Sequence, residues 1–250
     1  MKFGTPNLLA PNQIIALIIA IRSNTALLSY FLASQKGQEI ISGKRIVELG
    51  SGVGLPGLVS AHFAKNVVLT DGNDVVMELL QTNANLAHKD VNCAEMHTVK
   101  FIWGDCESLE KVLNLLESAD VVIAADVVQW PSVIEPLLNS VKALLWDDGR
   151  KSDKKRIFLL GIVKRATSTS DQFFKFAADL GFEWEKIEMS DFLQDGVVPP
   201  CCKESGGRVS ELFCLRLTDL TTQPFLFAPK SENNSDTTLG ENYQNCGLPC

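Results

Sequence analysis

Residues 45–58, RIVELGSGVGLPGL, constrain the fold of this chain more than any other stretch. The first five are mostly apolar and β-branched and too few for a helix, so we expect a buried parallel strand over 45–49. Glycines follow at positions 50, 52, 54 and 57, and a helix is expected to open from them. A turn without side chains lets a ligand approach the backbone, and the free N–H groups of a helix start bind polar ligand atoms. The stretch therefore predicts a nucleotide-type pocket.

The rest of the chain alternates short apolar runs with amphipathic segments, which is typical of an α/β fold with a mostly parallel sheet. Further strands are expected at residues 66–70, 96–103, 120–125, 156–162, 182–188 and 208–218. Helices are expected through 58–63 and over 75–87, 107–118, 131–145 and 171–180, the last closed by Gly181. The alternating run 208–218 predicts an antiparallel hairpin partner for 182–188.

The composition favours a single domain with tails. Of the 250 residues, 46% are hydrophobic and 21% charged, which suits one sizeable α/β core. We expect a helical N-terminal lead-in over 1–43, the main domain over 44–218 and a disordered tail over 219–250, where polar residues dominate.

The lead-in predicts two helical segments. Asn24 or Thr25 is expected to cap a helix that Gly37 ends. One face of that helix carries Leu27, Leu28, Phe31 and Leu32. The run 14–21, IIALIIAI, is too short to span a bilayer, so we expect a buried helix rather than a signal peptide. We expect no transmembrane segment and no membrane partner.

Charge and cysteine usage limit the partners and the compartment. The formal net charge is −7 without a dense stripe of Lys or Arg, so we expect no nucleic-acid partner. Seven cysteines show no CxxC pair and no metal-ligand spacing, and we interpret the adjacent Cys201 and Cys202 as incidental. The odd count fits reduced thiols in a reducing compartment, so we expect a cytoplasmic protein. We also expect a monomer without a metal site.

Acidic residues follow three of the expected strands at their carboxyl ends, where ligands bind in doubly wound sheets. Asp71 lies about twenty residues beyond the glycine turn, where an acid hydrogen-bonds both ribose hydroxyls, unless it caps the next helix. Asp105 could accept a hydrogen bond from an adenine amino group and Trp103 could stack near the base. The alternatives for these two are a turn residue and a core aromatic. Asp126 is expected to point into the same crevice as Asp71.

The glycine register decides between two classes of nucleotide cofactor. A dinucleotide fingerprint needs its third glycine five residues after its first, but counting from Gly50 that position is Leu55. Glu48, two residues ahead of the glycines, also counts against NAD. The segment VELGSGVGL instead resembles motif I of the seven-stranded S-adenosylmethionine-dependent methyltransferases, in which the acid and glycines hold the methionine part of the cofactor.

The resemblance covers about 25–218 and is greatest to the family-16 group, which contains many protein-lysine methyltransferases. That group has TD at the second strand end, WG after the third strand and D-hydrophobic-x-Y after the fourth; here 70–71, 103–104 and 126–129 read TD, WG and DVVQ. The resemblance implies a doubly wound, mostly parallel, seven-stranded Rossmann-like sheet with an antiparallel last strand. The implied cofactor is S-adenosyl-L-methionine.

The expected cofactor-binding residues are spread over four strand ends. They are Glu48, Gly50, Ser51, Gly52, Gly54, Asp71, Gly72, Asn73, Trp103, Gly104, Asp105 and Ala125. By resemblance, residues 50–52 line the methionine moiety, Asp71 holds the ribose and Trp103 lies by the adenine. The backbone at Ala125, with Asp126, borders the transferring methyl group.

Two departures from the group fall on the substrate side of the expected site. The aromatic residue after the fourth strand is replaced by Gln129, with Trp130 one position later, and the tryptophan that usually precedes the first helix is absent. We expect Asp126 and Gln129 to orient an amine in catalysis and Trp130 to supply an aromatic wall. The alternatives are that Trp130 is a core residue and that Asp126 caps the helix starting at Pro131.

Three functions are compatible with these residues. The resemblance implies an S-adenosylmethionine-dependent N-methyltransferase that transfers a methyl group to a lysine side chain of a protein substrate. A small-molecule methyltransferase would share the cofactor half of the site. A non-catalytic, cofactor-binding interaction protein would account for Gln129 and for the missing tryptophan.

Overall fold

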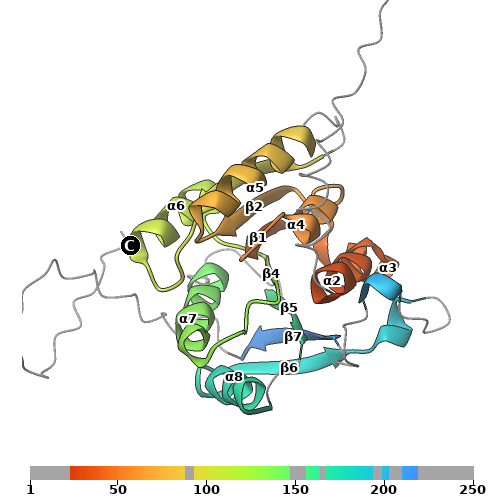
Figure 1. Ribbon diagram of the computed structural model, residues 1–250, viewed down its shortest axis with the longest axis vertical. Helices are drawn as coiled ribbons and strands as arrows, with labels where there is room; N and C mark the ends of the chain where they lie inside the picture. The colour runs from red at the N-terminus through yellow and green to blue at the C-terminus, as the bar shows by residue number, and fades with distance from the viewer. Residues whose placement is uncertain are drawn as a thin grey trace, which may run out of the picture.

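A seven-stranded sheet forms the centre of the molecule (Figure 1). The structure, a computed structural model, describes residues 23–87, 93–146, 156–163, 167–193, 199–202 and 210–218. The strands are β1 (Arg45–Leu49), β2 (Asn66–Asp71), β3 (Glu95–Lys100), β4 (Val121–Ala125), β5 (Ile157–Val163), β6 (Phe182–Ile187) and β7 (Ser210–Leu217). Their order is β3-β2-β1-β4-β5-β7-β6.

The strand directions confirm the expected sheet. Strands β1 to β5 run parallel, and β7 is antiparallel to both of its neighbours, β5 and β6. The hairpin pairing of β6 with β7 is therefore confirmed. The fold is a doubly wound, mostly parallel, Rossmann-like sheet, in which parallel strands deliver their carboxyl ends to one edge.

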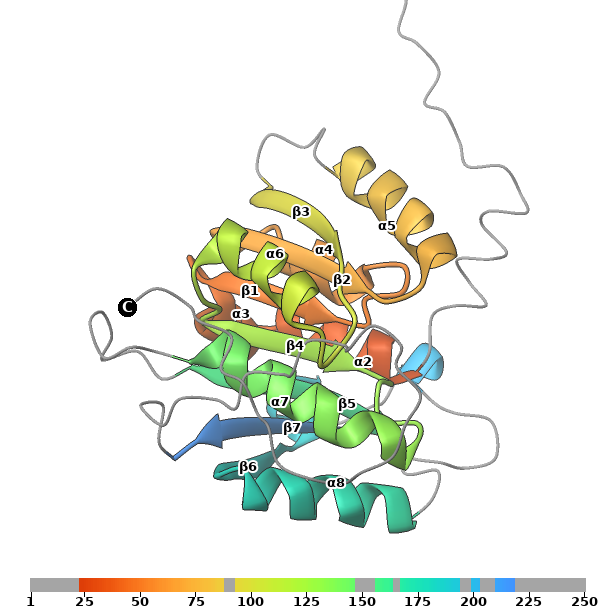
Figure 2. The ribbon, with the colours of Figure 1, turned by 90° about the vertical axis from the view of Figure 1, so that its left-hand side faces the viewer.

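Helices cover both faces of the sheet (Figure 2). One face carries α2 (Ser23–Ala33), α3 (Gln35–Ile41), α4 (Leu55–Ser60) and α5 (Asp74–Ala87). The other carries α6 (Cys106–Leu116), α7 (Ile134–Leu145) and α8 (Thr167–Asp179). Short 3-10 turns are η1 (Pro131–Val133), η2 (Met189–Asp191) and η4 (Pro200–Cys202).

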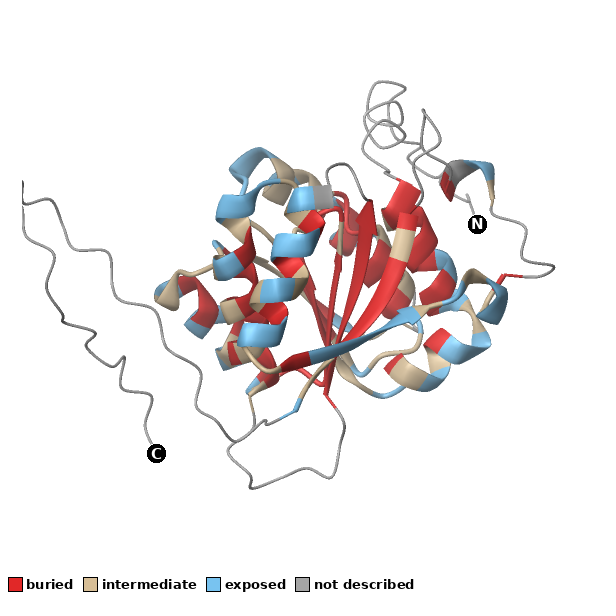
Figure 3. Ribbon diagram, turned by 90° about the horizontal axis from the view of Figure 1, so that it is seen from below, coloured by how far each residue is buried: buried red, intermediate tan, exposed pale blue. Residues whose placement is uncertain are grey.

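The two layers of core arise from the alternation of side chains along each strand. In β1, Ile46 belongs to the core cluster that includes residues of α2 and α5, while its neighbour Val47 belongs to the cluster that includes residues of α6 and α7, and both are fully buried. Because parallel strands are covered on both faces, they read as continuous apolar runs, which is why the sequence predicted them. Figure 3 shows the buried strands between the half-exposed helices.

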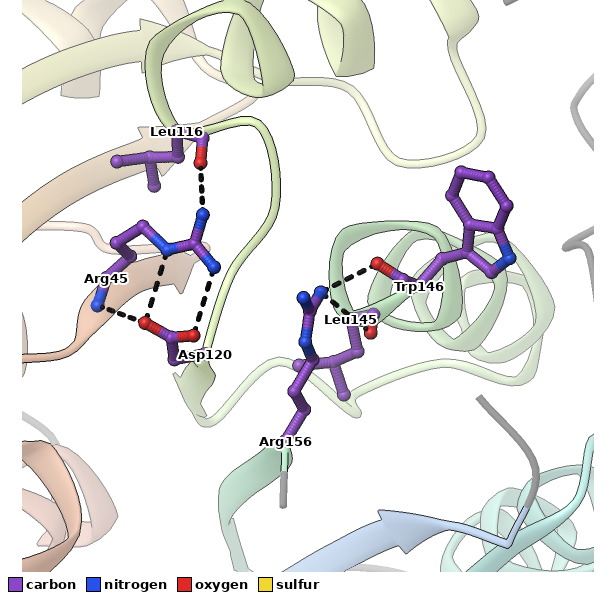
Figure 4. A network of polar contacts seen from close by, with 6 residues as sticks. All are labelled: Arg45, Leu116, Asp120, Leu145, Trp146 and Arg156. Carbon is purple, nitrogen blue, oxygen red and sulfur yellow. Dashed lines mark hydrogen bonds and ion pairs between the residues drawn. The ribbon is translucent and has the colours of Figure 1, made fainter. Parts of the chain in front are cut away.

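Two arginines fasten the amino-terminal edge of the sheet (Figure 4). The Arg45 guanidinium donates to both carboxylate oxygens of Asp120, at 3.2 and 3.0 Å, and to the carbonyl of Leu116 at 2.9 Å. Arg156 donates to the carbonyls of Leu145 and Trp146, at 3.2 and 2.7 Å. These carbonyl groups lie at the C-terminal ends of α6 and α7, where carbonyls have no hydrogen-bond partner within the helix. Each arginine therefore donates the hydrogen bonds that such carbonyls lack.

The helical lead-in differs from its expected form. Gly37 does not end a helix but lies inside α3, which Ser34 caps by accepting from the Gly37 N–H at 3.2 Å. A Cβ atom on Gly37 would lie 2.0 Å from the Phe31 carbonyl oxygen, so the glycine allows α3 to pack against the last turn of α2. Asn24 lies within α2.

Several other boundaries also move. The helix after β1 ends at Ser60, before the expected Phe63, and β3 ends at Lys100, which leaves Trp103 in a turn. The expected helix over 131–145 is η1, with Pro131 at its first position, followed by α7 from Ile134. Residues 14–21, the polar segment 147–155 and the tail 219–250 lie outside the described residues.

Candidate active site

Two glycines after β1, at positions 50 and 57, pack too tightly for a side chain. Gly50 has a φ of 61°, and a Cβ atom there would lie 2.8 Å from Val127 Cγ1 and 3.3 Å from Trp103 Cζ2. A Cβ on Gly57 would lie 2.1 Å from Leu69 Cδ2. The loop backbone therefore lies directly against the residues that follow β3 and β4.

Glu48 is a buried residue of β1 that hydrogen-bonds to the start of α4. It is 2% exposed, and its Oε2 accepts from the Gly57 N–H of α4 at 3.1 Å. Burial raises the pKa of Glu48 to about 8, against the lowering effect of hydrogen bonds from Gly57 and Ser51, with a smaller raising effect from Asp71. The carboxyl group thus fixes the start of α4 rather than facing the cavity.

Ser51 fastens the loop to the neighbouring strand. Its N–H donates to the Thr70 carbonyl at 2.8 Å, and its Oγ accepts from the Thr70 N–H at 2.9 Å. This pair of bonds continues the sheet ladder beyond β1 and places the following residue of β2, Asp71, opposite Gly52.

Asp71 joins the loop to the end of β2. Its two carboxylate oxygens accept from the N–H groups of Gly52 at 3.1 Å and Asn73 at 3.0 Å. The alternative that Asp71 caps α5 is wrong, because Asn73 Oδ1 accepts from the N–H of Val75 at 2.9 Å and of Val76 at 3.4 Å.

A cavity of about 430 Å³ opens at the carboxyl ends of β1, β2 and β4. Seven of the expected site residues line it: Gly50, Asp71, Gly72, Trp103, Asp126, Gln129 and Trp130. Six lining residues were not expected from the sequence: Phe101, Ile102, Val127, Ser132, Val133 and Pro136. The pair before Trp103 could have been found as an apolar extension of a strand that ends at the site.

The three residues Trp103, Gly104 and Asp105, in the loop after β3, make different contacts. Trp103 lines the cavity and also packs against the core, so the core-aromatic alternative is confirmed and its place beside the adenine stays a prediction. The Gly104 N–H donates to Ser140 Oγ of α7 at 3.1 Å. Asp105 caps α6, since its Oδ2 accepts from the Ser108 N–H at 2.9 Å, which places it outside the cavity lining.

Asp126 occupies a strained position on the far side of the cavity. It is 8% exposed and has a φ of 60°, a left-handed conformation that is uncommon for a residue other than glycine. Its N–H donates to the Gly161 carbonyl at 3.0 Å. The capping alternative is wrong, because η1 starts after Trp130 and has no side-chain cap.

Two side chains hold the Asp126 carboxylate. Gln129 Nε2 donates to the Asp126 carbonyl at 2.9 Å and lies 3.4 Å from Oδ2, while Asn24 Nδ2 lies 3.4 Å from Oδ1. Asn24 was expected only as a helix cap. Its spacing of three, four and seven residues from Leu27, Leu28 and Phe31 could have revealed it, because that spacing places a polar side chain on a buried helix face.

Trp130 stands at the mouth of the cavity. It is 62% exposed and lines the cavity beside Gln129, so the alternative of a core tryptophan is wrong.

Among the described residues, no group of three or more His, Cys, Asp or Glu side chains is arranged to hold a metal ion. Within the same ranges, every helix is too short or too polar to cross a bilayer.

The cavity has the chemistry of a nucleoside site with a second, acidic end. Phe101, Ile102 and Trp103 form an apolar wall suited to a base, and Asp71 beside them offers a carboxylate to a ribose. A Cβ on Gly52 would meet no atom within 4 Å, so the loop backbone is open to a ligand there. The residues present therefore fit an adenosyl cofactor.

Comparison with known proteins agrees with this geometry. Residues 15–179 match the protein family described as lysine methyltransferase. The chain belongs to this family. S-adenosylmethionine is the cofactor of the lysine methyltransferase family, and Asp71 and Trp103 both line the cavity.

Two relatives within the family show the extent of the similarity. The chain is 30% identical over 166 residues to a calmodulin-lysine N-methyltransferase of Arabidopsis thaliana, covering 66% of this chain and 51% of that protein. It is 32% identical over 172 residues to the protein N-terminal and lysine N-methyltransferase EFM7 of Yarrowia lipolytica, covering 61% of each. The chain thus spans about half to three fifths of the length of these relatives.

Solved structures share the fold of this lysine methyltransferase family member. The magnesium protoporphyrin IX methyltransferase of Synechocystis PCC 6803, with bound S-adenosylhomocysteine, superposes with a TM-score of 0.52 at 12% identity, covering 86% of this chain and 90% of that one. An O-methyltransferase of Bacillus cereus in complex with the same molecule gives 0.51 at 12% identity, covering 86% and 84%. At these identities the likeness concerns the fold alone.

Proposed function

We propose that the chain transfers a methyl group from S-adenosylmethionine to a lysine side chain of a protein substrate. One observation carries the proposal: a single cavity joins a nucleoside-type end, at Asp71 and Trp103, to an acidic and aromatic end, at Asp126 and Trp130. Membership of the lysine methyltransferase family supports this choice of acceptor.

The proposed cofactor contacts follow from the cavity lining. Asp71 accepts from the ribose hydroxyls with the lone pairs that its two backbone N–H partners leave available. Trp103 lies along the adenine, and the Gly50 and Gly52 backbone lies along the methionine part. Glu48 and Ser51 act through the loop, which they hold in place.

The chain's own contribution to the reaction is to position and desolvate the acceptor. When bound, S-adenosylmethionine supplies a sulfonium-activated methyl group for in-line transfer to a nucleophile. The lysine nitrogen must arrive without its extra proton, since its lone pair makes the new bond. Asp126 accepts a hydrogen bond from that amine and orients it, and Trp130 covers the alkyl stem and excludes water.

Methyl transfer can be tested with tritiated S-adenosylmethionine. The purified chain is incubated with cell extract and, separately, with calmodulin, because one relative is named for that substrate. We expect label in protein, and mass spectrometry is expected to place it on lysine. Label confined to small molecules would favour the small-molecule alternative, and label on histidine or arginine would contradict a lysine acceptor.

Cofactor binding needs a separate measurement. Isothermal titration with S-adenosylhomocysteine is expected to show one site per chain. Absence of binding would favour a non-catalytic interaction protein, whereas binding without transfer to any protein would contradict the proposed acceptor alone.

The surroundings of the enzyme are also part of the proposal. We place the methyltransferase domain at 44–218, with a lead-in over 1–43 and a tail over 219–250, and limited proteolysis tests these boundaries. The described cysteines Cys93, Cys106, Cys202 and Cys214 form no disulfide with one another, which suits a cytoplasmic location. We propose a monomer without nucleic-acid or membrane partners, which light scattering and binding assays test.

A further inference from the structure

We propose that Asn24 of α2 is a positioning residue, which holds the Asp126 carboxylate in the orientation that receives the acceptor amine. The inference rests on the proposed function, because it assigns Asp126 to the acceptor side. It adds a residue 102 positions away in the sequence, from a helix that does not line the cavity.

Asn24 lies directly behind Asp126. Its side chain is fully buried, and Nδ2 lies 3.4 Å from Asp126 Oδ1 and 3.2 Å from the Gly161 carbonyl oxygen. Its Oδ1 accepts from the Thr25 N–H at 3.1 Å. The orientation of the amide is fixed by chemistry, since a carboxylate and a carbonyl can only accept and must face the NH₂ group.

Gly161 joins the two residues. Its carbonyl accepts both from Asn24 Nδ2 and from the Asp126 N–H, the latter at 3.0 Å. A Cβ atom on Gly161 would lie 3.2 Å from the Asn24 carbonyl oxygen and 3.5 Å from Ala125 Cβ. The absence of a side chain at this point of β5 therefore lets α2 approach closely enough for Asn24 to reach Asp126.

The left-handed conformation of Asp126 explains why the contact with Asn24 matters. A left-handed residue other than glycine persists only where its surroundings over-determine it. Asn24 contacts Oδ1 of the carboxylate, Gln129 contacts Oδ2, and the Gly161 carbonyl accepts from the backbone N–H. Removing the Asn24 donor removes the hydrogen bond to Oδ1 and weakens the hold on the carboxylate orientation, whereas the side chains of Asp71 and Trp103 do not depend on this bond.

The neighbouring residue offers a matched control. Ser23 precedes Asn24 in α2, and its Oγ lies 2.9 Å from Ser210 Oγ, so this side chain attaches α2 to β7. Ser23→Ala weakens the docking of α2, whereas Asn24→Asp keeps the shape of the side chain and replaces the donor by a carboxylate.

The test compares methyl-transfer rate with cofactor affinity in these variants. For Asn24→Asp we expect a maximal rate about 100-fold lower, as for a misplaced reacting group. The apparent KM for S-adenosylmethionine and the Kd for S-adenosylhomocysteine are expected to stay within about threefold, and Ser23→Ala to keep its rate within about twofold. Equal rates for the two variants, or a loss of cofactor affinity that parallels the loss of rate, would overturn the proposal.

A second pair of variants covers the case in which Asn24→Asp does not fold. Asn24→Leu has a similar volume and no donor, while Asn24→Ser retains a hydroxyl donor. Rescue of the rate in Asn24→Ser relative to Asn24→Leu, at similar Tm, supports positioning by hydrogen bonding. Equal rates in both overturn it.

Failure of the proposed function gives a different result. If the wild-type chain binds S-adenosylhomocysteine but labels no protein, the lysine acceptor is wrong, and thermal unfolding decides the Asn24 contact. The Tm losses of Asn24→Leu and Asp126→Leu are then expected to be non-additive in the double variant. Additive losses would show that the two side chains do not act together.

Discussion

The Glu48 carboxyl group is buried and removed from water, which disfavours its charged form. Unfolded, it ionises near pH 4.5, whereas burial raises its pKa in the folded chain to about 8. Between these values the folded chain binds the extra proton, so the free energy of unfolding falls as pH rises, by up to about 1.4 kcal/mol per pH unit. The stabilising contribution is complete below pH 4.5 and is lost as pH passes through about 8.

Glu48→Gln removes this titration while keeping an acceptor for the Gly57 N–H. We expect the wild-type chain to lose stability relative to the variant as the pH rises from about 5 to about 8. Urea unfolding of both proteins across that range measures the difference. Parallel curves would show that the carboxyl group is ionised in the folded chain throughout.

Asp71→Asn tests the proposed ribose contact. A hydrogen bond to a charged group contributes roughly 1.5–3 kcal/mol, so we expect the Kd for S-adenosylhomocysteine to rise about 10- to 100-fold. Asp74→Asn is the control, since Asp74 is a nearby exposed acid paired with Lys100 at 2.7 Å. Equal affinities for the two variants would contradict the assignment of Asp71.

At the scale of elements, the glycine loop depends on its contact with β2. Gly57→Ala would drive a Cβ into Leu69 Cδ2 and to 2.6 Å from Glu48 Oε2. We expect a loss of about 1–3 kcal/mol in the free energy of unfolding, as for other overpacked sites. Gly72→Ala, whose Cβ would lie 3.6 Å from its nearest neighbour, is expected to unfold like the wild type. Denaturant titration distinguishes the two.

The parallel strands were predictable because each is a short apolar run. Asp71 and Asp126 directly follow two of these runs, so both were expected at the same edge of the sheet. The sequence also predicted Gly50 and its register. Helix ends were less predictable, as Gly37 shows, because its role is set by a packing contact with α2 rather than by local propensity.

Side-chain roles at the site depend on distant partners. Asn24 looked like a cap because local sequence does not show that Asp126 and Gly161 lie behind it. Asp105 was expected to accept a hydrogen bond from a base, but its carboxylate accepts from the Ser108 N–H three residues later. Contacts between strands and helices far apart in the chain decided both.

For the whole molecule, the two edges of the sheet have separate roles. The cavity lies at the carboxyl edge, while Arg45 and Asp120 pair at the amino edge. Asp120→Ala leaves Arg45 partly buried without its carboxylate, and we expect a loss of about 3 kcal/mol in the free energy of unfolding. The Kd for S-adenosylhomocysteine is expected to be unchanged below the new Tm. A weakened Kd would show that the edges are energetically linked.

The place of β7 has a consequence for synthesis on the ribosome. The last strand of the described residues, Ser210–Leu217, lies between β5 and β6. Until it emerges, β5, in which every residue is buried in the complete sheet, presents an unpaired apolar edge. A nascent or prematurely terminated chain that stops before Ser210 therefore lacks the partner strand of β5, and we expect it to aggregate more readily than the chain that includes β7.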